Sequence, residues 1–153
     1  MSAASATTER VDPRGVRFGA GVTSAVLAAV LVTGSAWLLA VQAAVFAIGA
    51  VAGPRRSPYS LLFAAVLRSR LGPPGELEPA EPPRFAQAVG LAFALAGVIG
   101  FAADATLVGF IATGLALVAA LLNAVTGFCL GCEMYLLIRR FTHTSTHNTE
   151  VSV

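Results

Sequence analysis

Apolar residues fill the first part of the chain without interruption by charge. Residues 18–53 contain no charged side chain. At about 1.5 Å per residue, one helix of that length would cross a hydrocarbon core of about 30 Å nearly twice. The Thr-Gly-Ser sequence at residues 33–35 suits a tight turn. The pattern therefore predicts two helices, at about residues 17–33 and 36–52.

A second apolar stretch predicts two further helices. They occupy about residues 85–103 and 106–128, and Asp104 lies in the turn between them. Between the two pairs of helices, residues 59–71 carry apolar positions at helical spacing but are too few to cross a bilayer. They predict an amphipathic helix lying in the membrane interface. Residues 72–84 are rich in proline and glutamate and predict a loop.

The predicted fold is an all-α membrane protein with four transmembrane helices arranged as two hairpins, with the short interfacial helix between them. Residues 1–16 form an N-terminal segment, residues 17–140 one membrane domain, and residues 141–153 a polar tail expected to be disordered. Each hairpin opens with an Arg-Phe pair and is followed by a Tyr- and Leu-rich segment that ends in arginine. Either an old duplication of a two-helix unit or convergence on membrane-suited patterns explains this repeat.

The basic residues predict the orientation in the membrane. They precede the first helix, lie between the second and third, or follow the fourth, and the two remaining turns contain none. This positive-inside pattern places both termini and the central loop in the cytoplasm of a multi-pass protein of a bacterial cell membrane. The basic residues, all arginines, are Arg10, Arg14, Arg17, Arg55, Arg56, Arg68, Arg70, Arg84, Arg139 and Arg140.

Composition supports the membrane assignment and excludes several functions. The chain is 56% hydrophobic and only 12% charged, which is too little charge for the surface of a soluble domain of 153 residues. A net charge of +2 with scattered arginines makes no phosphate-tracking stripe, so nucleic acid is not an expected partner. Both histidines lie in the C-terminal tail, so general acid–base catalysis lacks its usual residue.

The most distinctive chemical feature is a Cys-x-x-Cys motif formed by Cys129 and Cys132. On a helix these residues share a face, and the spacing suits a dithiol that cycles to a disulfide or carries a persulfide. Their position at the end of the fourth helix opposes thiolate formation, and the negative charge of Glu133 opposes it further. That objection weakens if Gly127 and Gly131 break the helix, because Cys129 would then begin a new segment.

Other interpretations of the two cysteines remain open. They provide half of a tetrahedral metal site, but the other ligands would have to come from Glu133, His143 or a second copy of the chain. A cysteine next to the membrane can also be acylated. Alternatively, both cysteines are small buried residues that allow close helix packing beside Gly127 and Gly131.

Thr126 and Asn123 lie about one and two turns before Cys129 and would line the same face of a continuous helix. In the dithiol interpretation, Asn123 and Glu133 position or tune the cysteine pair. Interhelical hydrogen bonding is the alternative for Asn123, and it is also the expected role of Gln42 in the second helix.

Several segments together resemble the uncharacterised bacterial domain-of-unknown-function family 4395. The resemblance covers about residues 11–140 and implies a small membrane protein of unknown biochemistry. Because such proteins look associated with thioredoxin-like proteins and sulfurtransferases through gene neighbourhood, it also implies a link to thiol or sulfur chemistry. The matching segments are VDPR at residues 11–14, GPRRSPY at 53–59, PPRFAQAVG at 82–90, LLNA at 121–124 and FCLGCEMY at 128–135.

The leading functional hypothesis is a membrane partner in cytoplasmic thiol-redox or sulfur handling, with Cys129 and Cys132 as the working dithiol. Its expected partners are the lipid bilayer and a thioredoxin-like protein or sulfurtransferase. No cofactor is expected. A non-enzymatic anchor or scaffold, with cysteines that only pack, is the first alternative, and a small transporter is the second. Four short helices bury little surface alone, which makes a homo-oligomer plausible.

Overall fold

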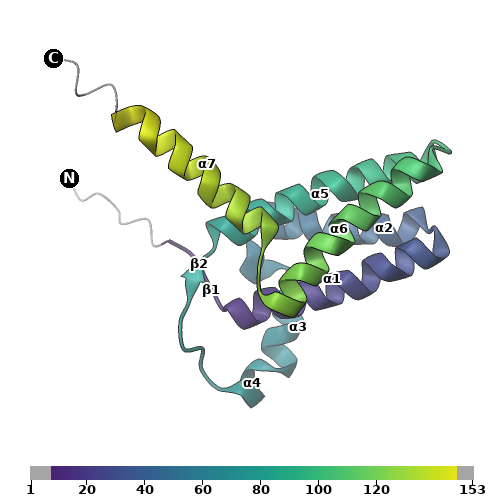
Figure 1. Ribbon diagram of the computed structural model, residues 1–153. Coiled ribbons are helices and arrows are strands. Elements are labelled where there is room, and N and C mark those ends of the chain that lie inside the picture. Colours follow the sequence, from purple (N-terminus) through teal and green to yellow (C-terminus); the bar gives the residue numbers. More distant parts are fainter. Residues whose placement is uncertain (1–7, 148–153) are drawn as a thin grey trace.

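The computed structural model describes residues 8–147 and is almost entirely helical (Figure 1). The helices are α1 (Pro13–Thr33), α2 (Ala36–Val51), the 3-10 helix η1 (Pro54–Arg56), α3 (Pro58–Val66), α4 (Arg68–Leu71), α5 (Glu81–Ala102), α6 (Thr106–Thr126) and α7 (Leu130–His147). Two short strands, β1 (Arg10–Val11) and β2 (Glu78–Pro79), pair antiparallel, with Arg10 opposite Pro79 and Val11 opposite Glu78.

The helices α1, α2, α5 and α6 run side by side as a bundle (Figure 1). The α1–α2 turn lies where the sequence predicts it. Gly34 ends α1 in the left-handed conformation (φ 64°), and its N–H donates to the carbonyl of Val30 at 2.7 Å. The hydroxyl of Ser35 then accepts the N–H of Leu38 and caps the start of α2. Asp104 marks the α5–α6 turn with a φ of 58°.

Three helices, α1, α5 and α6, are long and apolar enough to cross a membrane. Their surfaces agree with this, since large apolar side chains such as Ile99, Leu107 and Val125 are more than 60% exposed. The fourth expected span corresponds to α2, which is apolar but has 16 residues. The structure therefore has the helical hairpins expected of a membrane protein and three candidate spans.

Two of these helices begin earlier than the sequence analysis placed them. The carboxylate of Asp12 accepts the N–H of Arg14 at 2.9 Å and caps α1, whose first residue is Pro13. Pro82 and Pro83 fit the first turn of α5, where a missing N–H costs nothing, so that helix begins four residues before Phe85.

The core of the bundle is apolar and tightly packed. Leu27, Val30 and Leu39 are fully buried at its centre. The helices α5 and α6 approach closely where Gly100 faces Gly109. A Cβ built on Gly100 would lie 2.6 Å from the backbone nitrogen of Gly109, so only glycine permits this contact.

Two arginines cap helix ends across the hairpins in a reciprocal way. Arg17 of α1 donates to the carbonyl of Val125 at the end of α6, at 3.1 Å. Arg84 of α5 donates to the carbonyl of Val51 at the end of α2, at 2.6 Å. Such last-turn carbonyls lack partners within their own helix, and a guanidinium suits the negative end of the helix dipole.

The phenylalanines of the two Arg-Phe pairs also make equivalent ring contacts. The ring of Phe18 contacts Phe63 of α3, and the ring of Phe85 contacts Tyr135 of α7, each with centroids 5.7 Å apart. Each hairpin therefore holds the helix that follows it against its own first helix. Both repeats agree with duplication of a two-helix unit in parallel orientation.

The interfacial segment forms two helices rather than one. Helix α3 ends at Val66, Leu67 has a φ of −108°, and α4 is a single turn. Phe63 is the buried residue of α3, and its ring lies 3.2 Å from the position of a Cβ on Gly15, so the segment packs directly on α1.

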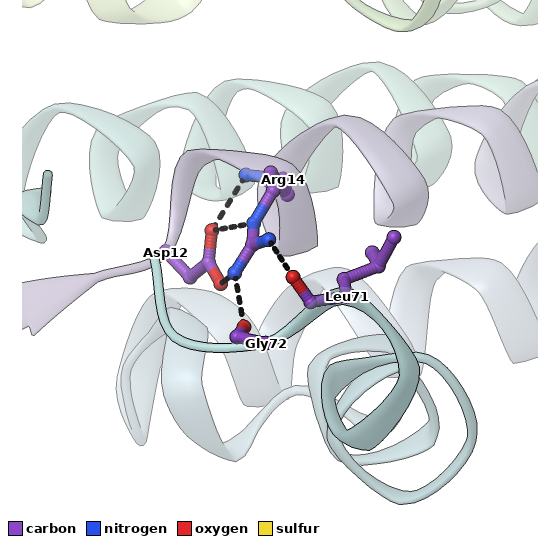
Figure 2. A network of polar contacts seen from close by, with 4 residues as sticks. All are labelled: Asp12, Arg14, Leu71 and Gly72. Carbon is purple, nitrogen blue, oxygen red and sulfur yellow. Dashed lines mark hydrogen bonds and ion pairs between the residues drawn. The ribbon is translucent and has the colours of Figure 1, made fainter. Parts of the chain in front are cut away.

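Arg14 fastens the end of α4 to the start of α1 (Figure 2). Its guanidinium pairs with Asp12 at 3.0 Å and donates to the carbonyls of Leu71 and Gly72 at 3.3 and 3.0 Å. Burial alone would raise the pKa of Asp12. The hydrogen bonds from Arg14 and the positive charges of Arg14 and Arg68 outweigh it, and the pKa is lowered.

The expectation of a disordered tail from residue 141 is corrected over residues 141–147, because α7 continues to His147. The threonine-rich sequence remains helical, and two of its hydroxyls bond back along the helix. Thr142 and Thr144 donate to the carbonyls of Ile138 and Arg140, each at 2.8 Å. Residues 148–153 lie outside the described part of the chain.

Candidate functional site

Gly127 separates the cysteine motif from α6. Helix α6 ends at Thr126, and Gly127 follows in the left-handed conformation with a φ of 76°. Its N–H donates to the carbonyl of Asn123 at 2.9 Å, which closes the helix. The chain then turns and starts α7, which leaves the bundle beside the first turns of α5 (Figure 1).

The motif therefore begins a helix and does not end the fourth one, as in the alternative in which glycine breaks the helix, although the break is at Gly127 alone and Gly131 lies within α7. Cys129 immediately precedes α7, and its carbonyl accepts the N–H of Glu133 at 3.0 Å. Its sulfur accepts the N–H of Cys132 at 3.3 Å. Cys129 thus stands where an N-cap residue stands, with sulfur in place of the usual side-chain oxygen.

The two cysteines are joined as a disulfide, with Cα atoms 5.2 Å apart. Both are half-buried. Because α6 ends at Thr126, neither cysteine shares a face of that helix with Asn123. The turn at Gly127 nevertheless brings Cys129 and Asn123 to one cavity.

Gly131 lets α7 cross α5 at short range. A Cβ on Gly131 would lie 2.6 Å from the Cβ of Ala86, so a larger residue would push the two helices apart. The close packing expected of the glycines is confirmed for Gly131, whereas Gly127 makes the turn. The contact fixes the first turn of α7, and hence the cysteines, against the bundle.

A cavity of about 330 Å³ opens beside Cys129. Its walls come from α1, α2, η1, α3, α5, α6 and the start of α7, and most of its lining is apolar. Aromatic rings of Phe46 and Phe93 form part of it. Polar side chains also reach it from several helices: Thr23, Tyr59, Gln87 and Asn123.

The cavity lies where the repeat between the hairpins breaks down. In the α2–α5 pair, Gln87 lies against Gly49, with its Oε1 2.7 Å from the position of a Cβ on that glycine. In the α1–α6 pair, Ala20 corresponds to Gln87, because each lies three residues after its capping arginine. Asn123 corresponds to Gly49, because each lies two residues before the residue whose carbonyl is capped. Ala20 is shorter than Gln87 and Asn123 is longer than Gly49, and both Ala20 and Asn123 line the cavity.

Asn123 and Gln87 have unused hydrogen-bonding capacity. Asn123 is 9% exposed, and its side chain makes no hydrogen bond to any residue in the described range. The Oε1 of Gln87 is buried and has no partner there either. The amide of Asn123 is therefore available to bind something that enters the cavity, whereas the Oε1 of Gln87 is packed against Gly49.

Gln42 bonds between helices, as the sequence analysis expected. It is fully buried, and its Oε1 accepts the hydroxyl of Tyr59 at 2.6 Å. Burial also raises the pKa of Tyr59, so the phenol remains a donor. Thr126, by contrast, is exposed and bonds back to Leu122 at 2.6 Å, away from the cavity.

Glu133 lies in the first turn of α7 and is exposed. It contacts the motif through its backbone N–H, and its side chain adds negative charge near the cysteines. No group of three or more potential metal ligands occurs within residues 8–147. A metal bound by Cys129 and Cys132 would therefore need ligands from outside this part of the chain.

Sequence reasoning missed Thr23, Tyr59 and Gln87 as neighbours of the motif. Gln87 carried an available signal, since it is a polar residue one turn inside an apolar helix. Tyr59 and Thr23 carried none, because interfacial tyrosines and membrane-helix threonines are common.

No curated protein and no solved structure gave a match to the chain. The model of the family described as Domain of unknown function (DUF4395) matches residues 11–140, in agreement with the resemblance noted in the sequence. Because that match covers most of the chain, this protein belongs to the DUF4395 family.

Proposed function

We propose that this protein is a multi-pass membrane protein whose Cys129–Cys132 pair carries thiol–disulfide exchange or sulfur transfer at the cytoplasmic face. The observation that carries the proposal is the placement of the pair at the N-terminus of α7. There the N–H of Cys132 points to the sulfur of Cys129 at 3.3 Å.

The geometry favours Cys129 as the nucleophile of the reduced pair. A helix N-terminus presents unpaired N–H groups and partial positive charge, both of which stabilise a thiolate. The N–H of Cys132 supplies one such donor directly. Cys132 then attacks the sulfur of Cys129 and forms the internal disulfide; a mixed disulfide releases the partner's thiolate, and a persulfide releases hydrosulfide. Glu133 opposes thiolate formation, so its removal should make the pair more acidic.

The proposed topology has four spans with both termini in the cytoplasm. All the arginines lie at one end of the bundle or on the segments that leave it, whereas the turns at Gly34 and Asp104 lie at the other end. The shortest span, α2, would be about 24 Å long, which a locally thinned bilayer can accommodate. This orientation puts Cys129 where cytoplasmic thioredoxin-like proteins or sulfurtransferases can reach it.

Differential alkylation in intact cells tests the proposal. Thiols are labelled with a membrane-permeant and an impermeant maleimide, before and after a disulfide-forming oxidant, and counted by mass spectrometry. We expect the pair to cycle between two thiols and one disulfide or persulfide, and to react only with the permeant reagent. Two thiols that stay reduced and unlabelled, or a pair that impermeant reagent reaches, would contradict the proposal.

A matched control reports the opposite end of the bundle. Ala105 is exposed in the α5–α6 turn. The variant Ala105→Cys, made together with Cys129→Ser and Cys132→Ser, should react with the impermeant reagent. If the impermeant reagent labels the Ala105→Cys variant and the native cysteine pair equally, the proposed orientation is refuted and the thiol chemistry stays open.

A scaffold role is the second candidate, and four exposed arginines favour it. Their side chains make no hydrogen bond to other described residues and remain available to an acidic partner. A scaffold predicts that Cys129→Ser is tolerated and that replacing these arginines with glutamine abolishes function. The four residues are Arg55, Arg56, Arg68 and Arg70.

A further inference from the structure

We infer that the cavity beside Cys129 binds a lipid-soluble quinone, which accepts the two electrons that Cys129 and Cys132 release when they form their disulfide. This inference rests on the proposed thiol function and names its electron acceptor. It follows from the cavity's opening, its polar groups and its position at the cysteine pair.

The cavity opens toward the bilayer. Leu115 lines it and is 54% exposed, and it lies in the middle of α6, an apolar helix long enough to cross a membrane. Leu130 and Met134 of α7 form another part of the rim and are 39% and 48% exposed. An occupant can therefore enter sideways from the lipid. An apolar lining of this kind suits a hydrophobic ring and not a charged oxidant such as oxidised glutathione.

The polar atoms in the cavity match the two ends of the quinone reaction. Quinone carbonyls accept hydrogen bonds, and the side-chain amide of Asn123 lines the cavity and makes no hydrogen bond within the described chain. The quinol product has hydroxyl groups, and the side-chain carbonyl of the same Asn123 can accept one. The site can thus satisfy oxidised and reduced forms of one ring.

The reaction balances without another reagent. The thiolate of Cys129 and the thiol of Cys132 lose two electrons and form one S–S bond. The quinone takes up those two electrons together with two protons and becomes the quinol; one proton comes from the Cys132 thiol, and the other comes from solvent, which received a proton when Cys129 ionised. The quinol returns to the bilayer, and a cytoplasmic dithiol reduces the Cys129–Cys132 disulfide for the next cycle.

The test uses the full-length protein in lipid nanodiscs, reduced and freed of reductant under anaerobic conditions. Decylubiquinone is the probe, because its fully substituted ring cannot form an adduct with a thiol. Quinone absorbance and alkylation mass spectrometry follow the reaction. We expect one quinol and one disulfide per protein. Retention of both thiols with this quinone, when oxidised glutathione does oxidise them, would overturn the inference and leave the proposed function intact.

Two bulky variants distinguish binding in the cavity from collision at the surface. Ala120 lines the cavity, whereas Ala88 is exposed on α5. Ala120→Phe should slow oxidation by the quinone about tenfold or more, with oxidation by glutathione disulfide unchanged, and Ala88→Phe should change neither rate. Equal quinone rates in the two variants would overturn the cavity as the site. If neither oxidant forms the disulfide in the unmodified protein, the proposed function fails as well.

Discussion

Replacing Gly100 with alanine should force α5 and α6 apart. The new Cβ would lie 2.6 Å from the backbone nitrogen of Gly109 and 3.1 Å from its Cα. The atoms it meets belong to a helix backbone, so no side chain can rotate away. Either α6 moves or the contact between the two helices is lost.

The cost follows from the overlap. The Cβ falls about 0.8 Å short of ordinary van der Waals contact, and overpacking of this kind costs about 1–3 kcal/mol. Alanine is also a better helix former than glycine, by about 1 kcal/mol in a helix interior. Gly114→Ala is the matched control, because a Cβ on Gly114 meets nothing within 4 Å. The propensity gain approximately cancels between the two variants, which leaves a difference of about 1–3 kcal/mol.

Unfolding in detergent with increasing dodecyl sulfate, followed by far-UV circular dichroism, measures this difference. Gly100→Ala should unfold at a lower mole fraction of dodecyl sulfate than the unmodified protein, and Gly114→Ala at the same or a higher one. Unfolding of both variants at the same mole fraction would show that α5 and α6 do not touch at Gly100.

Three further predictions concern polar contacts at the arginine-bearing end of the bundle. Arg84→Ala removes both caps from the end of α2 and should lower the free energy of unfolding by about 1–2 kcal/mol, whereas the exposed Arg55→Ala should not change it in the same dodecyl sulfate assay. Tyr59→Phe leaves the buried amide of Gln42 without its partner and should cost about 1–3 kcal/mol; equal stability would mean that the bond does not form. The lowered pKa of Asp12 adds stability that is fully present above its unfolded value of 3.8 and is lost as the pH falls through the folded value. Thermal unfolding from neutral pH to below 3.8 should therefore show a steeper loss for the unmodified protein than for Asp12→Asn, and parallel curves would contradict this assignment.

The bundle was largely predictable because its signals are local. Long uncharged runs indicate membrane helices, and the turns at Gly34 and Asp104 carry residues suited to left-handed conformations. The early start of α1 had a signal as well, since Asp12 followed by Pro13 is a typical helix beginning. Interpreting Arg14 as a residue outside the span obscured that signal.

The site was less predictable because its geometry depends on one backbone angle and on distant residues. Gly127 is compatible with a membrane helix, and the sequence does not show that it adopts a positive φ. That angle moves Cys129 from a helix C-terminus to a helix N-terminus, which reverses the electrostatic argument about its thiolate. The cavity is lined by residues of several helices, among them Ala20 of α1 and Asn123 of α6, and no local pattern reports such a gap.

The midpoint potential of the Cys129–Cys132 pair decides whether it is a working dithiol. The purified protein in lipid nanodiscs is equilibrated with glutathione buffers of known ratio, and alkylated thiols are counted by mass spectrometry. Thiol chemistry predicts a midpoint within the range of catalytic dithiols, about −270 to −120 mV. A midpoint below about −300 mV, typical of structural disulfides, or a pair that stays reduced in every buffer would contradict the proposed function.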